Sequence, residues 1–597
     1  MTSHVRTRAT VLISAFSLIV GLVAAPAVIA KPPVGGPAEG KAKTTTIQIL
    51  GLNDFHGNLE PPSGSGGRIG ALTGPATPPT LCVAPTCYLA GGVEYLATHV
   101  RQLRATNPNT LFVSAGDLIG ATPLISALFH DEPTIEAFNL MDLDFNGVGN
   151  HEFDEGVDEL LRMQNGGCHP IDGCVDGDPF TGADFQFLAA NVSYKSNGET
   201  IFPPYAIREY QGVNVAIVGM TLEGTPNIVT PAAVQSLDFA DEAASVNALV
   251  PVLKAQGIET IIVLLHEGGN TSFSQGVGNV AAINQCNSPT GPIPTIVNAM
   301  DDEVDVVITG HTNWAINCVL DGKVVTGAAH QGRLVTDIDL TISRATKDVI
   351  PTMTRVNNVI VTRDVAKAAD LTTLVTKYKT LSAPLANQIV GSVTADILRA
   401  NNTAGESALG DVIADSQLAA TADPLFGGAK VAFMNPGGIR TDILFSQISG
   451  GEALGEVTYG ELFAVQPFSN VMAVQTCTGA QLDALLEQQW GTASDGTPTQ
   501  TVLQVSEGFS YSWSASAPLG SRVDIASIMI NGVPISPTEP YRVAMNNFLA
   551  TGGDGFSTFA QCTNMIGGEI DLDVLVADFE ENSPIAPGPQ DRITRLP

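Results

Sequence analysis

Asn53-Asp54-Phe55-His56-Gly57 is the first of five short segments that decide the fold of this chain. The other four are Gly116-Asp117, Gly149-Asn150-His151-Glu152, His266-Glu267-Gly268 and Gly310-His311-Thr312-Asn313. Each segment ends an apolar run, and the runs 44–52, 110–114, 260–265 and 304–309 are rich in Ile, Val, Leu and Thr, which is typical of buried strands. Because loops at the carboxyl ends of strands in an open α/β sheet meet in one crevice, we expect the five segments to lie together.

The side chains of these segments have the pattern of a two-metal phosphoesterase. Such an enzyme places hydroxide in line with phosphorus, and two dications about 3.5 to 4 Å apart can hold the nucleophile and the phosphoryl oxygens. We expect Asp117 to bridge the metals, since it stands alone after its strand with a Gly before it. Asp54 and His56 should bind one metal together, because side chains two residues apart on an extended segment point to the same side. The other expected ligands are Asn150, His266 and His311 for the second metal and, more weakly, Asn313 for the first.

His151 directly follows an expected ligand, so we expect it to face a bound phosphate, with Asp154 orienting and charging its imidazole. The pair would stabilise the transition state or protonate the leaving oxygen, and both roles remain open. A single Asp-x-His or Gly-His is more often an ordinary loop, whereas five such segments in this order favour a site. The histidines outside the pattern are interpreted as surface or packing residues: His99, His130, His169 and His330.

Length and charge limit the kind of protein. A chain of 597 residues is too long for one core, and we expect two large domains. The formal charge of −32 repels polyanions and argues against binding to nucleic-acid duplexes. It does not exclude a small phosphorylated substrate, because bound dications and local arginines outweigh a screened field.

The N-terminus and the cysteines favour an exported protein. Residues 1–30 have the pattern of a secretory signal peptide, and neither a second membrane-length apolar stretch nor a lipid-anchor motif follows. The eight cysteines are interpreted as disulfides rather than a metal site, because their spacings are not of the CxxC type. The expected pairs are Cys82 with Cys87, Cys168 with Cys174 and, less firmly, Cys286 with Cys318 and Cys477 with Cys562.

The order of patterns along the chain predicts its domains. Residues 31–43 form a flexible lead-in, and strands and helices then alternate, with a helix over 92–107 and further strands over 186–192, 213–220 and 333–342. The first domain covers 44–355, a linker helix or hinge covers 356–388, and a second α/β unit covers 389–597.

At these motifs the chain resembles the 5'-nucleotidase family of secreted metallophosphoesterases, over nearly the whole mature length. Asn53-Asp54-x-His56-Gly57, Gly149-Asn150-His151-Glu152 and the Gly-Gly-Asp-Gly run ending at Gly555 carry the resemblance. It implies an N-terminal calcineurin-like four-layered α/β/β/α domain with two divalent metals, often zinc or manganese. It also implies a C-terminal α/β domain that binds the nucleotide and rotates about the linker.

The resemblance also implies the substrate contacts. Arg440 would bind phosphate, Asn435 the base edge and Asp554 the ribose hydroxyls, while Phe468 and Phe548 would stack on the base. Many members carry arginines just before the Glu-Ser-x-Leu-Gly segment, where this chain has Thr403 and Gly405, so that Arg399 is the guanidinium left there. Without the resemblance, either Phe would be interpreted as a core residue.

Three functions follow as hypotheses. The first is a secreted metal-dependent 5'-nucleotidase that hydrolyses nucleotide phosphoesters to nucleoside and phosphate. The second is a 2',3'-cyclic nucleotide phosphodiesterase with 3'-nucleotidase activity, or a UDP-sugar hydrolase. The third is an exported nucleotide-binding protein without catalysis, which the intact metal and dyad positions oppose. We expect a periplasmic, cell-wall or extracellular location, and the sequence leaves the oligomeric state open.

Overall fold

The structure is a computed structural model that describes residues 43–62, 66–73, 81–229, 231–271, 280–286, 288–468, 470–492 and 498–597. The expected signal peptide, and the lead-in except for Lys43, lie outside the described residues. Within the described ranges, none of the helices has the length and apolar character needed to cross a membrane.

The first sheet has six strands in the order β16-β15-β1-β4-β5-β6. Their bounds are β1 (Thr44–Leu52), β4 (Thr110–Ser114), β5 (Phe145–Gly147), β6 (Gln186–Leu188), β15 (Leu334–Ser343) and β16 (Arg355–Ile360). Strands β1, β4, β5 and β6 run parallel, β15 pairs antiparallel with β1, and β16 pairs antiparallel with β15 at the edge. The sheet therefore continues past residue 355, where we expected the first domain to end.

The predicted strand over 186–192 is two strands. After β6 the chain turns, and β7 (Val192–Tyr194) pairs with β10 (Leu237–Phe239) in a separate ribbon. The turn is held by Asn191, whose side chain accepts a hydrogen bond from Thr221 N and donates one to Thr221 O. A side-chain amide that bonds to another segment replaces the ladder bonds a continuous strand would need.

The second sheet also has six strands, in the order β13-β14-β12-β11-β9-β8. Their bounds are β8 (Tyr205–Tyr210), β9 (Val213–Thr221), β11 (Thr260–His266), β12 (Val304–Thr309), β13 (Ala315–Leu320) and β14 (Lys323–Ala328). The central strands β9, β11, β12 and β14 are parallel, and β8 and β13 pair antiparallel at the two edges.

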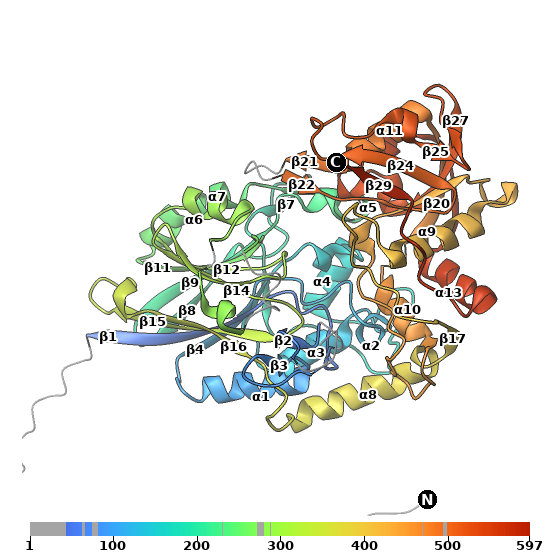
Figure 1. The fold of residues 1–597 in the computed structure, drawn as a ribbon. Coiled ribbons are helices and arrows are strands. Elements are labelled where there is room, and N and C mark those ends of the chain that lie inside the picture. Colours follow the sequence, from blue (N-terminus) through green and yellow to red (C-terminus); the bar gives the residue numbers. More distant parts are fainter. Residues whose placement is uncertain are drawn as a thin grey trace, which may run out of the picture. The chain divides into compact units, whose positions relative to one another are not determined.

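The two sheets pack face to face, and helices cover their outer faces (Figure 1). Between the sheets lies an apolar cluster that includes Ile49 of β1, Leu264 of β11 and Ile308 of β12. The first sheet is covered by α1 (Val93–Arg104), α3 (Glu132–Leu140) and α4 (Val157–Asn165), and the second by α6 (Glu242–Ala255) and α7 (Pro292–Ala299). Strands that are buried on both faces need near-continuous apolar sequence, so the apolar runs in the sequence predict them well. The predicted α/β/β/α layering is confirmed.

Helix α8 (Ala369–Ala386) lies where the linker was expected. It contacts α1, α3 and the short α2 (Leu124–Ala127) of the first half, and α10 (Tyr459–Val465) of the second. Its Tyr378 is buried, and the hydroxyl donates to Glu136 and Asp176 of the first half. The helix is therefore anchored mainly on the first half.

The second half is built on a five-stranded sheet in the order β23-β18-β27-β20-β28 and a four-stranded sheet in the order β26-β25-β24-β29. The strands of the first are β18 (Val431–Met434), β20 (Val471–Thr478), β23 (Gln504–Val505), β27 (Pro540–Asn546) and β28 (Thr563–Ile570). Those of the second are β24 (Phe509–Ser514), β25 (Met529–Ile530), β26 (Val533–Pro534) and β29 (Ile593–Leu596). Its main helices are α9 (Ala408–Thr421), α11 (Gly479–Glu487) and α13 (Asp571–Asn582).

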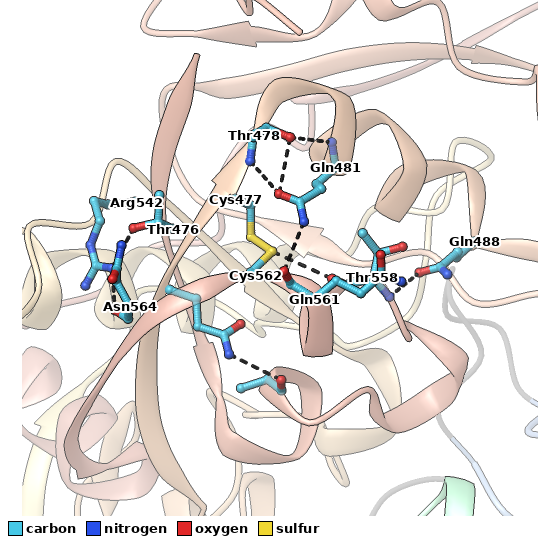
Figure 2. Close-up of a disulfide and its surroundings, with 12 residues drawn as sticks. Thr476, Cys477, Thr478, Gln481, Gln488, Arg542, Thr558, Gln561, Cys562 and Asn564 are labelled. Atoms are coloured by element: carbon cyan, nitrogen blue, oxygen red, sulfur yellow. Dashed lines mark hydrogen bonds between the residues drawn. A yellow bond between two sulfur atoms is a disulfide. The ribbon is translucent and has the colours of Figure 1, made fainter. Parts of the chain in front are cut away.

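All four predicted disulfides are present: Cys82–Cys87, Cys168–Cys174, Cys286–Cys318 and Cys477–Cys562. Figure 2 shows the last, which joins the end of β20 to the chain before β28. Next to it Thr478 and Gln481 form a capping box that starts α11, and Gln481 Nε2 donates to Gln561 O at 3.2 Å. The covalent link and the cap hold the same corner of the second half together.

Candidate metal centre and substrate residues

The five segments meet at the carboxyl ends of strands from both sheets of the first half. Asp54 and Asp117 follow β1 and β4, Asn150 follows β5, His266 ends β11, and His311 follows β12. The sequence expectation of one crevice beyond the strand ends therefore holds, with the difference that two sheets contribute to it.

Asp117 lies between two groups of side chains. Its Oδ2 is 3.1 Å from Nε2 of His266 and 3.7 Å from Nε2 of His56. His56 Nε2 is in turn 4.0 Å from Asp54 Oδ1. Asp117 thus belongs to two sets of potential ligands at once, the position that a bridging carboxylate must occupy.

Asn150 joins the remaining histidines. Its Oδ1 is 3.0 Å from His266 Nε2 and 2.9 Å from His311 Nδ1. Asp117, Asn150, His266 and His311 therefore form the compact second group that the sequence predicted.

Backbone carbonyls orient two of the imidazoles. His56 Nδ1 lies 2.9 Å from Gly120 O, and His266 Nδ1 lies 2.7 Å from Ala115 O. An Nδ1–H that donates to a carbonyl fixes the tautomer and leaves Nε2 to bind a metal.

The donor set fits two borderline dications. Asp54 Oδ1 is buried and has no hydrogen-bond partner, an arrangement that costs free energy unless a cation compensates it. Imidazole nitrogens with carboxylate and amide oxygens suit zinc and manganese.

Burial and neighbouring charges shift the pKa values of the predicted ligands in opposite directions. Burial raises the pKa of Asp54 to about 7, although His266 acts in the opposite direction. Burial alone would lower the pKa of His266, but Asp117 raises it to about 10. Burial lowers the pKa of His56 and of His311 to about 3, which keeps both imidazoles neutral, the form that binds metals.

The ligand loops have an unusual backbone. Asp54, His56, Asp117 and His311 all have positive φ, between 47° and 66°. The expectation that Asp54 and His56 share an extended segment was therefore wrong, because a tight turn brings them together. Left-handed backbone at non-glycine residues is strained and concentrates at functional sites.

Gly116 is required by close packing. It has φ of +91°, and a Cβ there would lie 2.6 Å from Nδ1 of His266 and 2.7 Å from the backbone nitrogen of Gly149. From the sequence, Gly116 was expected to leave room for a metal beside Asp117. In the structure it leaves room for the imidazole of His266, a predicted ligand.

His151 and Asp154 are paired as predicted. His151 opens the helical turn η1 (His151–Phe153), and its Nδ1 lies 2.8 Å from Asp154 Oδ2. Its backbone N–H donates to Asp117 Oδ1 at 3.0 Å. Burial acts to lower the pKa of His151, but Asp154 and Asp117 outweigh it, so the pKa is raised. His151 also lies close enough to His56 and Asp117 to be a ligand itself.

Glu152 holds two loops of the predicted centre together, a role that was not predicted from the sequence. Its buried carboxylate accepts hydrogen bonds from the backbone N–H groups of Asp117, Leu118 and Gly149 at 2.6 to 2.9 Å. It therefore ties the Asp117 loop to the Asn150 loop. A Glu two positions after an expected ligand was the available signal.

Asn313 and His330 both lie near the predicted metal centre. Asn313 Nδ2 donates to His311 O at 3.4 Å, within its own loop, and its role as a ligand stays a prediction. His330 was interpreted as a surface or packing residue. Its pKa is lowered well below the usual value by burial, then by Arg333 and His56, with Arg399 and Arg440 adding to this. His330 thus lies within the electrostatic field of the site.

Two polar residues of the second half that were predicted to bind substrate, Asn435 and Asp554, form a connected group with Asn546. Asn435 Nδ2 donates to Asp554 Oδ2 at 2.8 Å, and Asn546 Nδ2 donates to Asn435 Oδ1 at 3.0 Å. Burial raises the pKa of Asp554.

The two arginines are neighbours. Arg440 donates to Gly437 O and Arg399 to Ile439 O. Burial and then Arg399 lower the pKa of Arg440, and Asp154 opposes this. Arg440 therefore lies within electrostatic reach of the first half.

The two predicted stacking residues have different neighbours. The ring of Phe468 lies 5.8 Å from that of His151 with 19° between their planes, and the Arg440 guanidinium lies 5.6 Å from the Phe468 centroid. Phe548 packs over Gly553, where a Cβ would lie 2.5 Å from its ring. Phe468 thus faces the predicted dyad. Phe548, in the short helix α12 (Asn547–Ala550), instead packs against the loop that carries Asp554.

Comparison with known proteins agrees with this architecture. Residues 47–314 match the calcineurin-like phosphoesterase family, and residues 388–561 match the C-terminal domain of 5'-nucleotidases. A solved 5'-nucleotidase precursor from Thermus thermophilus has the same fold, with a TM-score of 0.70, 24% identity, and coverage of 92% of this chain and 99% of that one.

Two curated relatives are more similar in sequence. The chain is 31% identical over 515 residues to Endonuclease YhcR of Bacillus subtilis, covering 85% of this chain but only 37% of that protein. It is 30% identical over 571 residues to Cell wall protein Lmo0130 of Listeria monocytogenes, covering 91% of this chain and 68% of that protein. The chain therefore spans little more than a third of the first relative.

Proposed function

Because this chain belongs to the 5'-nucleotidase family, and is a phosphoesterase hydrolase of that family, we propose that it is an exported enzyme that releases phosphate from nucleoside monophosphates. The proposal places the predicted ligands Asp54, His56, Asp117, Asn150, His266 and His311 around two dications, zinc or manganese, with Asn313 as a further candidate. It places the substrate on Arg399, Asn435, Arg440, Phe468, Phe548 and Asp554.

One observation carries the proposal: the approach of Phe468 and Arg440 from the second half to His151 of the first. A base-stacking ring and a phosphate-binding guanidinium beside a metal-ligand cluster are the groups a nucleotide ester needs. Bidentate binding of phosphate by a guanidinium adds geometric selectivity to charge.

Two bound dications would supply Lewis acidity and activate water for attack on phosphorus. The protein's own residues then orient the ester. Arg440 would hold the phosphate, and Phe468 would hold the base and keep water away from it. His151, charged by Asp154, would stabilise negative charge on the phosphoryl group or give a proton to the leaving oxygen.

We propose the domain order that the sequence indicated: a signal peptide over 1–30, a lead-in over 31–43, a catalytic domain over 44–355, a linker over 356–388 and a substrate domain over 389–597. Because β16 belongs to the first sheet, the catalytic domain extends to residue 360. The helix α8 would form the linker. The disulfides and the name of the Listeria relative support an extracytoplasmic location.

The test is phosphate release by purified protein, stripped with EDTA and reloaded with Zn²⁺ or Mn²⁺. The panel contains AMP and other 5'-monophosphates, 3'-AMP, 2',3'-cyclic AMP, UDP-glucose and single-stranded DNA. Preference for 5'-monophosphates that EDTA abolishes supports the proposal, with the Asp117→Asn variant as the inactive control. Absence of EDTA-sensitive release from every member of the panel refutes it.

The same panel separates the alternatives. Opening of 2',3'-cyclic AMP to a nucleoside monophosphate, followed by phosphate release from 3'-AMP, would identify the cyclic phosphodiesterase. Conversion of UDP-glucose to UMP and glucose 1-phosphate, followed by chromatography, would identify the UDP-sugar hydrolase. Cleavage of DNA would transfer to this chain the activity that the name of the Bacillus relative states, which the charge of −32 disfavours. Tight nucleotide binding without turnover would indicate a binding protein.

A further inference from the structure

The backbone of Gly120 connects a predicted metal ligand to a buried carboxylate. Its carbonyl oxygen lies 2.9 Å from Nδ1 of His56, whose Nε2 faces Asp117 at 3.7 Å. Its N–H donates at 3.0 Å to Oδ2 of Asp131, a buried residue between α2 and α3. Asp131 therefore lies one residue of backbone away from the group that orients His56.

We propose that Asp131 is a positioning residue of the predicted metal centre: its carboxylate holds the backbone of Gly120, which in turn fixes the imidazole of His56. The inference rests on the proposed function in taking His56 as a metal ligand. The outer partners of metal-binding histidines fix the ring and its tautomer, and their loss typically lowers metal affinity by about 10- to 100-fold.

The carboxylate of Asp131 is directed at the loop rather than at its own helix. Asp131 stands at the N-cap of α3, where an Asp side chain usually accepts a hydrogen bond from the first turn, and it makes no such bond. Its backbone is left-handed, with φ of 62°. An uncapped helix and a left-handed non-glycine residue both cost free energy, so other contacts must determine this conformation. Those contacts are Gly120 N and the hydroxyl of Ser126, which donates to Oδ1 at 2.6 Å.

The carboxylate is itself held in place. Ser126 Oγ also lies 2.7 Å from Thr134 Oγ1, and both residues are fully buried. Burial raises the pKa of Asp131 to about 6, although hydrogen bonds from Ser126 and Gly120 N oppose this. At about pH 8 the side chain is therefore a carboxylate, which accepts from both donors at once.

Gly120 is confined on its other side. It has φ of +77°, and a Cβ there would lie 2.4 Å from the carbonyl oxygen of His151. Its Cα therefore packs directly on the predicted dyad. Glu152 accepts from the first N–H groups of the same loop, so Glu152 holds the start of the loop and Asp131 holds its end.

The effect of Asp131 should be confined to one of the two dications. His56 belongs to one of the two ligand groups that share Asp117, and not to the group of His266 and His311. Without the carboxylate, Gly120 N would lose its acceptor and the carbonyl behind His56 would no longer be fixed.

Zinc affinity of the full-length protein tests the proposal. Wild type and variants are loaded with Zn²⁺ and titrated at pH 8 with a chelator of known affinity, which gives a dissociation constant for each of two ions. Asp131→Ala should weaken one ion by about 10- to 100-fold and leave the other unchanged. Asp131→Asn should bind both ions nearly as wild type does, because its amide oxygen accepts from Gly120 N and its NH₂ group donates to Ser126 Oγ. Rescue by Asn separates positioning from a general effect on the fold.

Asp144→Ala is the matched control. Asp144 also accepts from a backbone N–H, that of Phe112 at 2.9 Å, but it lies directly before β5, at the opposite end of that strand from Asn150. This variant should keep both zinc constants. Ser126→Ala, which removes the second donor to Asp131, should weaken the same ion less than Asp131→Ala does. Circular dichroism verifies that each variant is folded.

Three results overturn the proposal: wild-type zinc constants in Asp131→Ala, an equal loss in Asp131→Asn, and an equal loss in Asp144→Ala. If Asp131→Ala does not fold, wild-type constants in Ser126→Ala overturn it instead. The titration contains no substrate, so a protein that hydrolyses no nucleotide but shows these affinities refutes the proposed function alone.

Discussion

The ring of Phe468 lies parallel to the imidazole of His151, 5.8 Å away, although the two residues belong to different halves of the chain. His151 is held on its other side by Asp154, at 2.8 Å. Phe468, proposed to stack on the base, therefore lies next to His151, proposed to stabilise charge or donate a proton.

Phe468→Ala should weaken binding of nucleotides far more than binding of small phosphoesters. Stacking on an aromatic ring contributes about 1 to 3 kcal/mol per base, so KM for AMP should rise by about 5- to 150-fold. KM for p-nitrophenyl phosphate should change little. Phe426→Ala, at a Phe that is 55% exposed, is the control and should leave both values unchanged. An equal rise for both substrates would show that Phe468 acts on the phosphate end.

His151→Asn should lower kcat by about 10²- to 10⁴-fold, the usual contribution of a general acid or an equivalent charge. Asp154→Asn should lower it less, because the imidazole stays in place without its charging partner. Zinc content should be unchanged in both variants. Loss of one metal in His151→Asn would instead identify His151 as a ligand, an arrangement that its closeness to Asp117 allows.

Glu152→Gln should lower the metal affinity of the predicted centre, although Glu152 is not a predicted ligand. A glutamine can accept with one oxygen, so its amide group would face backbone N–H groups of Asp117, Leu118 or Gly149 that now donate to the carboxylate. An unpaired buried donor costs about 1 to 3 kcal/mol, and metal affinity should fall by about 10- to 100-fold. Competition with a zinc chelator measures the affinity. Glu209→Gln on the surface of β8 is the control, and equal affinities in the two variants would contradict the role.

Asp305 of β12 should make the protein less stable as the pH rises. Burial raises its pKa to about 8, with Asp348 and Glu303 adding to this, while Ile261 N donates to its Oδ2. The folded state therefore binds a proton that the unfolded state releases near pH 4, so stability is highest at low pH and falls as the pH rises from about 4 to 8. The loss attributable to this group between pH 4 and 8 should be on the order of 5 kcal/mol.

Asp305→Asn should remove that part of the pH dependence, because the amide oxygen still accepts from Ile261 N and carries no charge. Urea unfolding at pH 5 and at pH 8 measures the effect, with Asp302→Asn on the surface as the control. The same pH dependence in Asp305→Asn and wild type would show that Asp305 is not responsible.

The sequence predicted the sheet strands well where they are buried on both faces. The runs at 44–52, 110–114 and 304–309 coincide with β1, β4 and β12, because a strand without a solvent face needs uninterrupted apolar residues. The strand predicted over 186–192 is present over 186–188 as β6, and its continuation to 192 was wrong. The side-chain hydrogen bonds of Asn191 to Thr221 end it, and they depend on a strand that comes later in the chain.

The sequence predicted which residues lie together at the site, but not the backbone conformation that brings them together. Asp54 and His56 were expected on an extended segment and lie in a left-handed turn, which the chain tolerates because surrounding contacts fix it. Glu152 could not be assigned because its partners are backbone N–H groups, which are present at every non-proline position and leave no pattern in the sequence. The stacking of His130 on His169 joins α2 to a disulfide loop, and no spacing along the chain indicates it.

The amino-acid sequence by itself determined the strand-ending motifs, the two short disulfides Cys82–Cys87 and Cys168–Cys174, and the family to which the chain belongs, because these depend on residue type and local order. The tertiary structure alone decided that Asp117 lies between two groups of potential ligands and that Phe468 faces His151. Those relationships depend on how two sheets and a second half pack together. Packing is set by the sum of many weak contacts, whereas a motif is set by a few residues that are adjacent in the chain.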